Sequence, residues 1–248
     1  RSMVAVLKTI VDGDIVAYRA AAHKVEDKDG KRECTAVEAL EYAKAFMKEI
    51  LAECSFYNEG GDYSVYLTGK GNFRFDIAKT AVYKGNRSDK PKPSMLPVVR
   101  RYLSEEWDAI TSEGEEADDL IAIDAADTGY RAVVATIDKD MLQIKGLHYN
   151  LTKKTFTYMD RFDGLHWFYK QILMGDAADN IKGLHRVGPV KAEDMLVHCT
   201  NEKELYHAVV HRYDGDEERV LENARLLWLR RTEGELWVPP HHRKPKAA

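Results

Sequence analysis

The feature that most constrains the fold is an alternation of short β-branched runs with helical patterns through the first 150 residues. The run VAVLKTIV at residues 4–11 is followed by Asp12-Gly13-Asp14 and then by a helical pattern over residues 15–22. The run RAVVATI at residues 131–137 is followed by Asp138. Apolar runs of this length are typical of buried strands. The alternation predicts an α/β fold with a mostly parallel central sheet flanked by helices.

Periodicity supplies the other elements. Apolar residues at helical spacing predict helices over residues 36–54 and 115–126. Period-two alternation predicts a strand over residues 62–68 and a small hairpin over residues 148–158. From residue 162 to residue 229 the pattern predicts helices throughout, and no internal repeat is present.

Composition excludes several classes of protein. The chain is 44% hydrophobic and 31% charged, which is typical of a globular protein. Its three cysteines are far apart and odd in number, so we expect reduced thiols rather than a disulfide framework or a zinc site. We find no signal peptide and no long apolar run, which predicts a cytoplasmic protein without a membrane partner.

Residues 70–101 form a basic segment in a chain whose net charge is −4. The segment holds nine Lys or Arg and two Asp, a local net charge of +7, and three prolines that interrupt any helix. Most charge runs are solvated loops. Here aromatic residues lie among the basic ones, a mixture that favours phosphate contact with base stacking: Phe73, Phe75, Tyr83 and Tyr102.

Acidic residues follow the predicted strands. Asp12 ends the first strand, and Asp138 and Asp140 follow the second. In the stretch EGEEADDLIA, three further acids lie against an apolar helical run: Glu116, Asp118 and Asp119. The carboxyl ends of parallel strands share one edge of a sheet, where ligands bind. Two further acids, Asp176 and Asp179, are three residues apart, so one helical turn would direct both to the same side.

Each acid also has a structural interpretation. Asp12 before Gly13 is compatible with a plain turn, and Asp14 is best interpreted as the N-cap of the following helix. Glu116 gains from the helix dipole, Asp138 and Asp140 have Lys139 as a local counter-charge, and Asp176 is compatible with a helix cap. If each acid had only its structural role, eight acids would gather at one edge of the sheet by coincidence. We therefore favour a shared function for these acids.

Hard divalent cations are the natural compensation for such a set, because Mg²⁺ and Mn²⁺ prefer oxygen ligands. No His lies near these acids in the sequence, which argues against zinc. Eight acids exceed the needs of one Mg²⁺, so we predict two ions about 3.5–4 Å apart, as in phosphoryl-transfer sites.

A second signal is GDAADNIKGLHRVGPVKAEDML at residues 175–196. Gly183 and Gly188 permit a tight turn whose N–H groups face a phosphate, Pro189 suits the first turn of the next helix, and Lys191 adds charge there. A helical hairpin used only for packing is the alternative. The adjacent acids favour the phosphate interpretation.

These motifs resemble the 5′-nuclease superfamily: flap endonucleases, the 5′-nuclease domain of bacterial DNA polymerase I, and bacteriophage 5′→3′ exonucleases. The matching motifs are VDGD, YKGNR (83–87), EEADD, TIDKD and GDAADNIKGLHRVGPVKA, in family order from residue 11 to residue 192. Their forms and the short chain are most similar to the phage enzymes. The resemblance implies a PIN-like or resolvase-like core with a C-terminal helix–three-turn–helix DNA-binding subdomain.

The resemblance also implies residue roles. The metal ligands would be Asp12, Glu116, Asp118, Asp119, Asp138, Asp140, Asp176 and Asp179. Lys84 would bind the scissile phosphate with help from Arg87, and both would lie with Tyr83 on a basic helix beneath an arch that passes a 5′ single strand. DNA would also contact Gly183, Gly188, Lys191, Lys90 and Lys92, with K⁺ at the hairpin loop. The family usually has Pro and Gly where His185 and Arg186 stand.

We therefore expect three regions: a nuclease core over residues 3–160 that includes the arch at 70–101, a helical duplex-binding region over 161–232 with its hairpin at 173–199, and a tail over 233–248. The predicted activity is Mg²⁺-dependent hydrolysis of DNA at or near a 5′ end or flap, or of the RNA strand of a hybrid. We expect a monomer, in the host cytoplasm if phage-encoded. The alternatives are a PIN-like single-strand ribonuclease and a metal-free nucleic-acid-binding module.

Overall fold

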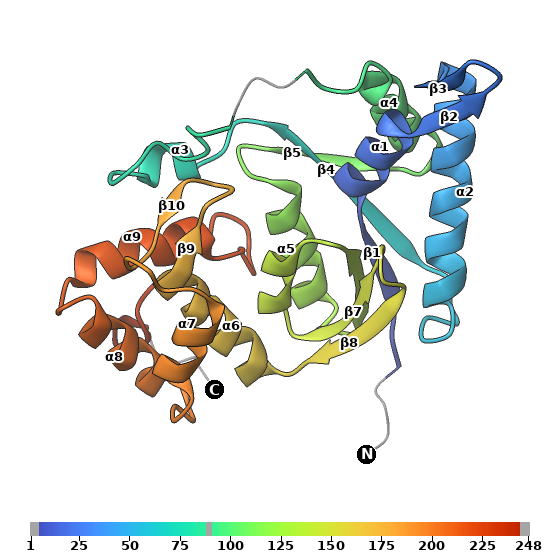
Figure 1. Cartoon of the computed structure of the whole chain (residues 1–248). Helices are drawn as coiled ribbons and strands as arrows, with labels where there is room; N and C mark the ends of the chain where they lie inside the picture. Colours follow the sequence, from blue (N-terminus) through green and yellow to red (C-terminus); the bar gives the residue numbers. More distant parts are fainter. Residues whose placement is uncertain (1–4, 88–90, 244–248) are drawn as a thin grey trace. The chain divides into compact units, whose positions relative to one another are not determined.

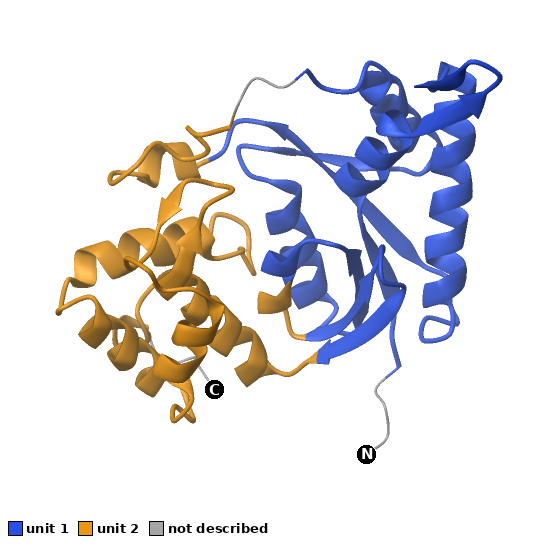
Figure 2. Ribbon diagram, viewed as in Figure 1, with its two compact units in different colours: residues 1–72, 89–141, 146–158 blue, residues 73–88, 142–145, 159–248 orange. Residues whose placement is uncertain are grey.

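The computed structural model describes residues 5–87 and 91–243. The chain forms two compact units, shown in blue and orange in Figure 2. Unit 1 comprises residues 1–72, 89–141 and 146–158, and unit 2 comprises residues 73–88, 142–145 and 159–248. Residues 73–88, which we predicted as part of the arch, therefore group with the helical unit.

Unit 1 is built on a six-stranded, mostly parallel sheet, which confirms the predicted fold class. The strand order is β5-β4-β1-β6-β7-β8. Their bounds are Lys8–Asp12 for β1, Tyr63–Lys70 for β4, Ile110–Glu113 for β5, Ala132–Thr136 for β6, Gly146–Asn150 for β7 and Thr155–Met159 for β8. β1 and β6 are parallel neighbours, so Asp12 and the residues after Thr136 leave the sheet at the same edge.

Four helices accompany this sheet: α1 (Gly13–Ala22), α2 (Ala36–Cys54), α4 (Leu96–Glu106) and α5 (Ala117–Asp127). Figure 1 shows α2 and α5 on opposite sides of β1 and β4. Side chains of α1, α2 and α4 share one buried cluster with β1, β4 and β6. The predicted helix at 36–54 is confirmed at both ends, and a capping box formed by Thr35 and Glu38 defines its start.

The sequence did not predict some elements of unit 1, and it gave others different bounds. The hairpin β2 (Lys24–Asp27) and β3 (Gly30–Glu33) is almost wholly exposed, so it carries no apolar alternation. α4 begins in the proline-rich segment because Pro97 lies in its first turn, where a missing N–H does no harm. β1 begins at Lys8 rather than Val4, since its pairing starts with Lys8 opposite Ala132.

Unit 2 packs helices around its own apolar cluster: α3 (Arg74–Ile77), α6 (Arg161–Met174), α7 (Pro189–Leu196), α8 (Glu202–Arg212) and α9 (Glu217–Leu227). The prediction of helix throughout residues 162–229 is wrong at one place. Gly175 adopts φ +69 and ends α6, and the short antiparallel strands β9 (Gly175–Asp176) and β10 (Ile181–Lys182) follow. No helix within residues 5–87 and 91–243 has the length and apolarity that crossing a bilayer requires.

Candidate active site

Asp12 stands where β1 passes into α1, and it is 3% exposed. One carboxylate oxygen accepts the N–H of Ile15 at 3.3 Å, and the other accepts the hydroxyl of Thr136 at 2.7 Å. The same hydroxyl accepts the N–H of Asp138 at 3.0 Å. Thr136 therefore links the carboxyl ends of β1 and β6 and holds the acids that follow them together.

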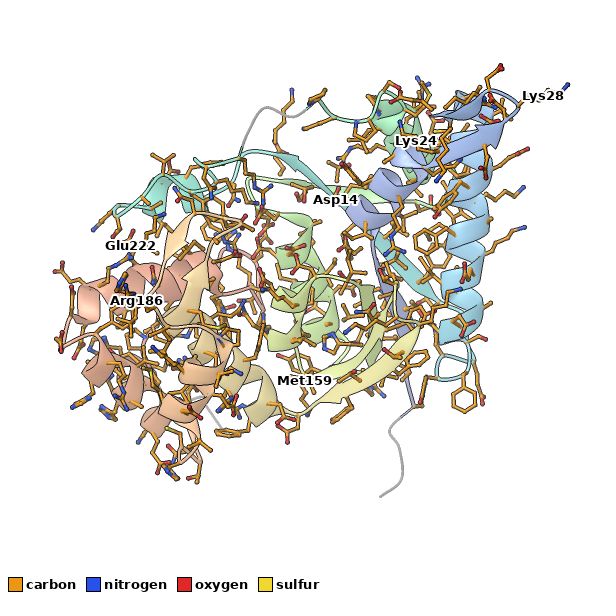
Figure 3. All side chains as sticks on the ribbon, in the orientation of Figure 1. Asp14, Lys24, Lys28, Met159, Arg186 and Glu222 are labelled. Carbon is orange, nitrogen blue, oxygen red and sulfur yellow. The ribbon has the colours of Figure 1, made fainter. Side chains whose placement is uncertain are left out.

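Asp14 is not the N-cap that we predicted. Asp12 caps α1, because its carboxylate accepts the N–H of Ile15, while Asp14, labelled in Figure 3, lies two residues further in the first turn of α1. Asp14 accepts the N–H of Thr68 at 3.0 Å and pairs with Arg100 at 2.7 Å. Arg100 also donates to the carbonyl of Thr68 at 2.6 Å. The negative charge of Asp14 is thus matched by a cation on α4.

The start of α5 brings further acids to this site. The N–H of Glu116 donates to the carboxylate of Asp119 at 3.2 Å, and Asp119 is fully buried. After β6 the chain enters a 3-10 helix (Lys139–Gln143), and the N–H of Asp140 donates to the carboxylate of Asp138 at 2.8 Å. Capping and turn contacts of this kind satisfy parts of these carboxylates without neutralising them.

The electrostatics show that the acids act on one another. Burial raises the pKa of Asp12 to about 7, with help from the carboxylates of Asp14 and Asp138 and against the bonds from Thr136 and Ile15. The pKa of Asp118 lies well above its ordinary value, first through burial and then through four carboxylates: Asp12, Asp138, Asp119 and Asp140. Five acids from three chain segments therefore share one neighbourhood, which only a cation or bound protons can neutralise.

The donor set consists of carboxylate oxygens, and it fits a hard divalent cation such as Mg²⁺ or Mn²⁺. Within the part of the chain that the structure describes, no three Asp, Glu, His or Cys side chains are yet arranged as the ligands of a single ion. The assignment of Asp12, Glu116, Asp118, Asp119, Asp138 and Asp140 as metal ligands stays a prediction.

Asp176 and Asp179 belong to unit 2. We predicted that these two acids share one helical turn, and this prediction is wrong. Asp176 ends β9, and Asp179 lies in the turn between β9 and β10. Asp176 accepts the N–H of Ala178 at 2.8 Å, which starts that turn. Their role as metal ligands stays a prediction as well.

Asp179 is bound to all three predicted catalytic residues. The hydroxyl of Tyr83 donates to its carboxylate at 2.8 Å, Arg87 donates to it at 2.5 Å, and the ammonium of Lys84 lies 3.7 Å away. The N–H of Lys84 also donates to the carbonyl of Asp179 at 2.8 Å. The structure thus brings Tyr83, Lys84 and Arg87 together around one acid.

The predicted basic helix beside the site is instead a turn. Lys84 has φ +56, in the left-handed region that a continuing α-helix excludes, and the N–H of Gly85 bonds the carbonyl of Val82. The side-chain amide of Asn86 donates to the carbonyl of Ala177 at 2.6 Å. These bonds connect residues 82–87 to the turn that carries Asp179.

The aromatic residues of the basic segment have different roles. Arg230 lies 3.7 Å over the ring of Phe73, Tyr83 is 3% exposed, and Tyr102 packs against the apolar cluster of unit 1. Phe75 is 54% exposed and forms a T-shaped pair with the ring of Tyr83. Of these four rings, that of Phe75 is therefore the one best placed to stack on a base.

The hairpin residues of unit 2 also divide by role. A Cβ on Gly183 would lie 2.1 Å from the backbone carbon of Met174, so this glycine permits close backbone packing at the end of α6. Gly188 is exposed and extended, and Lys191 is exposed in the first turn of α7. Arg186 has φ +57, the conformation that glycine adopts most readily.

Two predicted DNA contacts come from the arch. Lys92 is exposed in unit 1, whereas Lys90 lies outside the described residues. No comparison or contact tests their role, and DNA binding by these lysines stays a prediction.

Sequence reasoning missed the residues that organise the acids. Thr136 was visible as a hydroxyl two residues before Asp138 at the end of a strand. Arg100 gave no local signal, because its partner Asp14 lies 86 residues away.

Comparisons with known proteins identify the family of this chain. A model of the family "5′-3′ exonuclease, N-terminal resolvase-like domain" matches residues 8–172. The chain therefore belongs to the 5′-3′ exonuclease family. It is 28% identical over 168 residues to a 5′-3′ exonuclease of Buchnera aphidicola, covering 62% of this chain and 58% of the relative. It is 29% identical over 163 residues to flap endonuclease Xni of Shewanella piezotolerans, covering 58% and 60%.

The chain thus spans less than two thirds of the length of these relatives. A similar fold is found in the bacteriophage T5 flap endonuclease, solved as a pseudo-enzyme–product complex with DNA and metal ions. The TM-score is 0.66 at 17% identity, and the match covers 89% of this chain and 88% of the phage protein. This likeness confirms the α/β architecture.

Proposed function

We propose that this protein is a divalent-metal-dependent 5′-nuclease that hydrolyses phosphodiester bonds of DNA at or near a 5′ end. The observation that carries the proposal is the crowding of Asp118 by four other carboxylates at the carboxyl edge of a parallel sheet. Such crowding disfavours the metal-free ionised state, and divalent ions would relieve it. Membership of the 5′-3′ exonuclease family supports the same reaction.

The six predicted ligands of unit 1 would hold Mg²⁺ or Mn²⁺ ions, two in number as the sequence predicts. The ligand roles of Asp176 and Asp179, in unit 2, are a separate part of this proposal. When bound, such ions activate a water molecule and stabilise charge on the attacking and leaving oxygens. Asp12 must lose its proton to serve as a ligand, so the site becomes competent as the pH rises through about 7.

Lys84 and Arg87 supply positive charge for the scissile phosphate. Both are held by Asp179, and Tyr83 binds the same carboxylate. Transfer of these cations from Asp179 to a phosphate would place two donors where charge develops during hydrolysis. Lys84 has the larger role in this scheme, because it is 17% exposed whereas Arg87 is 57% exposed.

The substrate proposed is duplex DNA with a 5′ end or 5′ flap, and the RNA strand of a hybrid is a second substrate to test. Backbone contacts from Lys191, Lys92 and the Gly188 loop would carry little base identity. The proposal has three further parts: K⁺ binds at the hairpin loop, the protein is a monomer, and it acts in the cytoplasm. That cytoplasm is the host cell's if the chain is phage-encoded. A bacteriophage origin remains a prediction.

The decisive experiment compares a 5′-labelled flap DNA with a blunt duplex, in Mg²⁺ and in EDTA. We expect Mg²⁺-dependent cutting that Asp118→Asn and Lys84→Ala each reduce at least 100-fold. Asp214→Asn is the matched control, because Asp214 is an exposed acid in a turn at φ +55, where Asn is well tolerated.

Cutting near the flap junction would identify a flap endonuclease, and short products from the blunt duplex would identify an exonuclease. Cleavage of single-stranded RNA alone would support the ribonuclease alternative. Full activity of either site variant would contradict the proposed site.

A further inference from the structure

A single carboxylate on α9 binds the chain just before the predicted catalytic turn. Glu222 accepts the N–H of Lys79 at 2.7 Å, the N–H of Thr80 at 2.8 Å and the hydroxyl of Thr80 at 2.7 Å. Its side chain is 9% exposed and also pairs with Arg219 at 3.2 Å. Figure 3 labels Glu222 on α9.

These bonds anchor one end of a short segment. We name residues 78–87 the Lys84 segment, which starts where α3 ends and finishes at Arg87. Its far end is bound through Tyr83, Lys84 and Arg87 to Asp179. The Lys84 segment therefore has two anchors, Glu222 near its start and the Asp179 turn near its end.

The carboxyl group of Glu222 is held in its charged, hydrogen-bonded form. Burial favours the neutral form of its carboxyl, but the bonds from Thr80 and Lys79 outweigh burial and lower the pKa below its ordinary value. Hydrogen bonds to a charged acceptor are stronger than neutral ones. α9 itself is fixed in the apolar cluster of unit 2 by Val220, Ala224 and their neighbours.

The anchor at Asp179 is different, because it engages the cations themselves. A phosphate that takes Lys84 and Arg87 removes two of the three side-chain contacts of Asp179. The bonds of Glu222 go to residues 79 and 80 and involve neither cation, so they survive substrate binding. Preorganised donors are effective only when their support is rigid.

We propose that Glu222 is a positioning residue for Lys84, holding the Lys84 segment in place while its cations exchange Asp179 for the scissile phosphate. This inference rests on the proposed function, in which Lys84 contacts the substrate. It adds a residue 138 positions away in the sequence, on a helix that carries no family motif.

The first test is kinetic. Glu222→Ala should lower kcat for flap DNA about 10- to 100-fold with KM changed less than 3-fold, because the Lys84 contact strengthens only in the transition state. Thr80→Val removes one of the three bonds and should lower kcat a few-fold. Glu218→Ala is the matched control, since Glu218 is exposed on the same helix. Folding should persist, because Arg219 keeps Asn223 and the Lys182 carbonyl as partners.

The second test separates positioning from general damage. In a Lys84→Ala background, Glu222→Ala should cause no further loss of kcat, since it acts only through Lys84. A similar loss in both backgrounds would overturn the inference. Amide hydrogen exchange of Lys79 and Thr80 should accelerate at least 10-fold in Glu222→Ala without DNA or metal, and unchanged exchange would also overturn it.

The outcomes distinguish the two proposals. No cleavage by the unaltered chain with any divalent ion would contradict the proposed function. Cleavage by the unaltered chain together with an unchanged kcat in Glu222→Ala would contradict only the role of Glu222.

Discussion

At the scale of single residues, the acid cluster opposes folding in the absence of metal. Asp12 and Asp118 are buried beside other carboxylates, and both have raised pKa values. A carboxyl whose pKa is higher in the folded than in the unfolded state destabilises the fold when it ionises. Ionisation of these carboxyl groups therefore prepares the site for a cation but lowers the stability of the metal-free protein.

The pH dependence of stability follows from Asp12. Its pKa is about 7 when folded and 3.8 in the reference state, so its contribution is fully present below pH 4 and is lost as the pH rises to about 7. Asn has no charge, its carbonyl oxygen can accept the N–H of Ile15, and its NH2 group can donate to the hydroxyl oxygen of Thr136. Asp12→Asn should therefore stabilise the metal-free protein by about 2 kcal/mol at pH 8.

Urea unfolding in EDTA at pH 5 and pH 8 measures this effect, with Asp214→Asn as the control. The gain in stability should be smaller at pH 5 than at pH 8. An equal or larger gain at pH 5 would show that ionisation of Asp12 is not the cause.

The affinity for divalent ions should rise over the pH range in which the stability of the metal-free protein falls. Because Asp12 must be deprotonated to bind a cation, affinity for Mn²⁺ should rise about 10-fold or more between pH 6 and pH 8. Mn²⁺ should also raise the Tm of the unaltered chain and leave that of Asp118→Asn unchanged. Calorimetric titration and thermal unfolding test both statements, and a pH-independent affinity would contradict the first.

At the scale of elements, the loop from Gly183 to Gly188 depends on backbone conformation. Arg186 occupies the left-handed region at φ +57, and a Cβ on Gly183 would overlap the end of α6. Gly188 has open space around the position of a Cβ. These three positions should respond differently to substitution.

We expect Gly183→Ala to cost about 3 kcal/mol or more, because backbone must move. Gly188→Ala should cost less than about 1 kcal/mol, the difference between these residues at an N-cap. Arg186→Gly should stabilise by about 1 kcal/mol through relief of the left-handed strain. Urea titrations followed by tryptophan fluorescence give all three values, and a stabilising Gly183→Ala would refute the packing argument.

The elements also show what sequence can predict. The helix over 36–54 was predictable because its apolar residues recur at helical spacing along its whole length, and the structure adds the capping box at its start. The strands β2 and β3 were not, since neither face is buried. The acids at strand ends were predictable from chain order, whereas the contacts of Asp179 with Tyr83, Lys84 and Arg87 required tertiary structure.

At the scale of the whole molecule, charge is distributed unevenly: the chain has a net charge of −4 and residues 70–101 have +7. DNA affinity that depends on such a segment falls with salt, because phosphate contacts release counterions. We expect affinity for flap DNA to fall at least 10-fold between 50 and 200 mM KCl. Lys191→Gln should reduce the slope of log affinity against log salt by about 1, as fluorescence anisotropy in EDTA would show. A salt-independent affinity would contradict the predicted contacts.

The discontinuity of unit 2 has a consequence for synthesis on the ribosome. Tyr83 is buried and belongs to the same apolar cluster as residues of α6, α8 and α9, although it precedes the first of these helices by more than 70 residues. Residues 73–87 therefore emerge long before the helices that share their apolar cluster, and the rest of unit 1 is synthesised in the interval. A nascent chain released near residue 160 would expose Tyr83 and the guanidinium of Arg74 to solvent and to chaperones. The order of translation thus makes the predicted catalytic turn one of the last parts of the protein to become ordered.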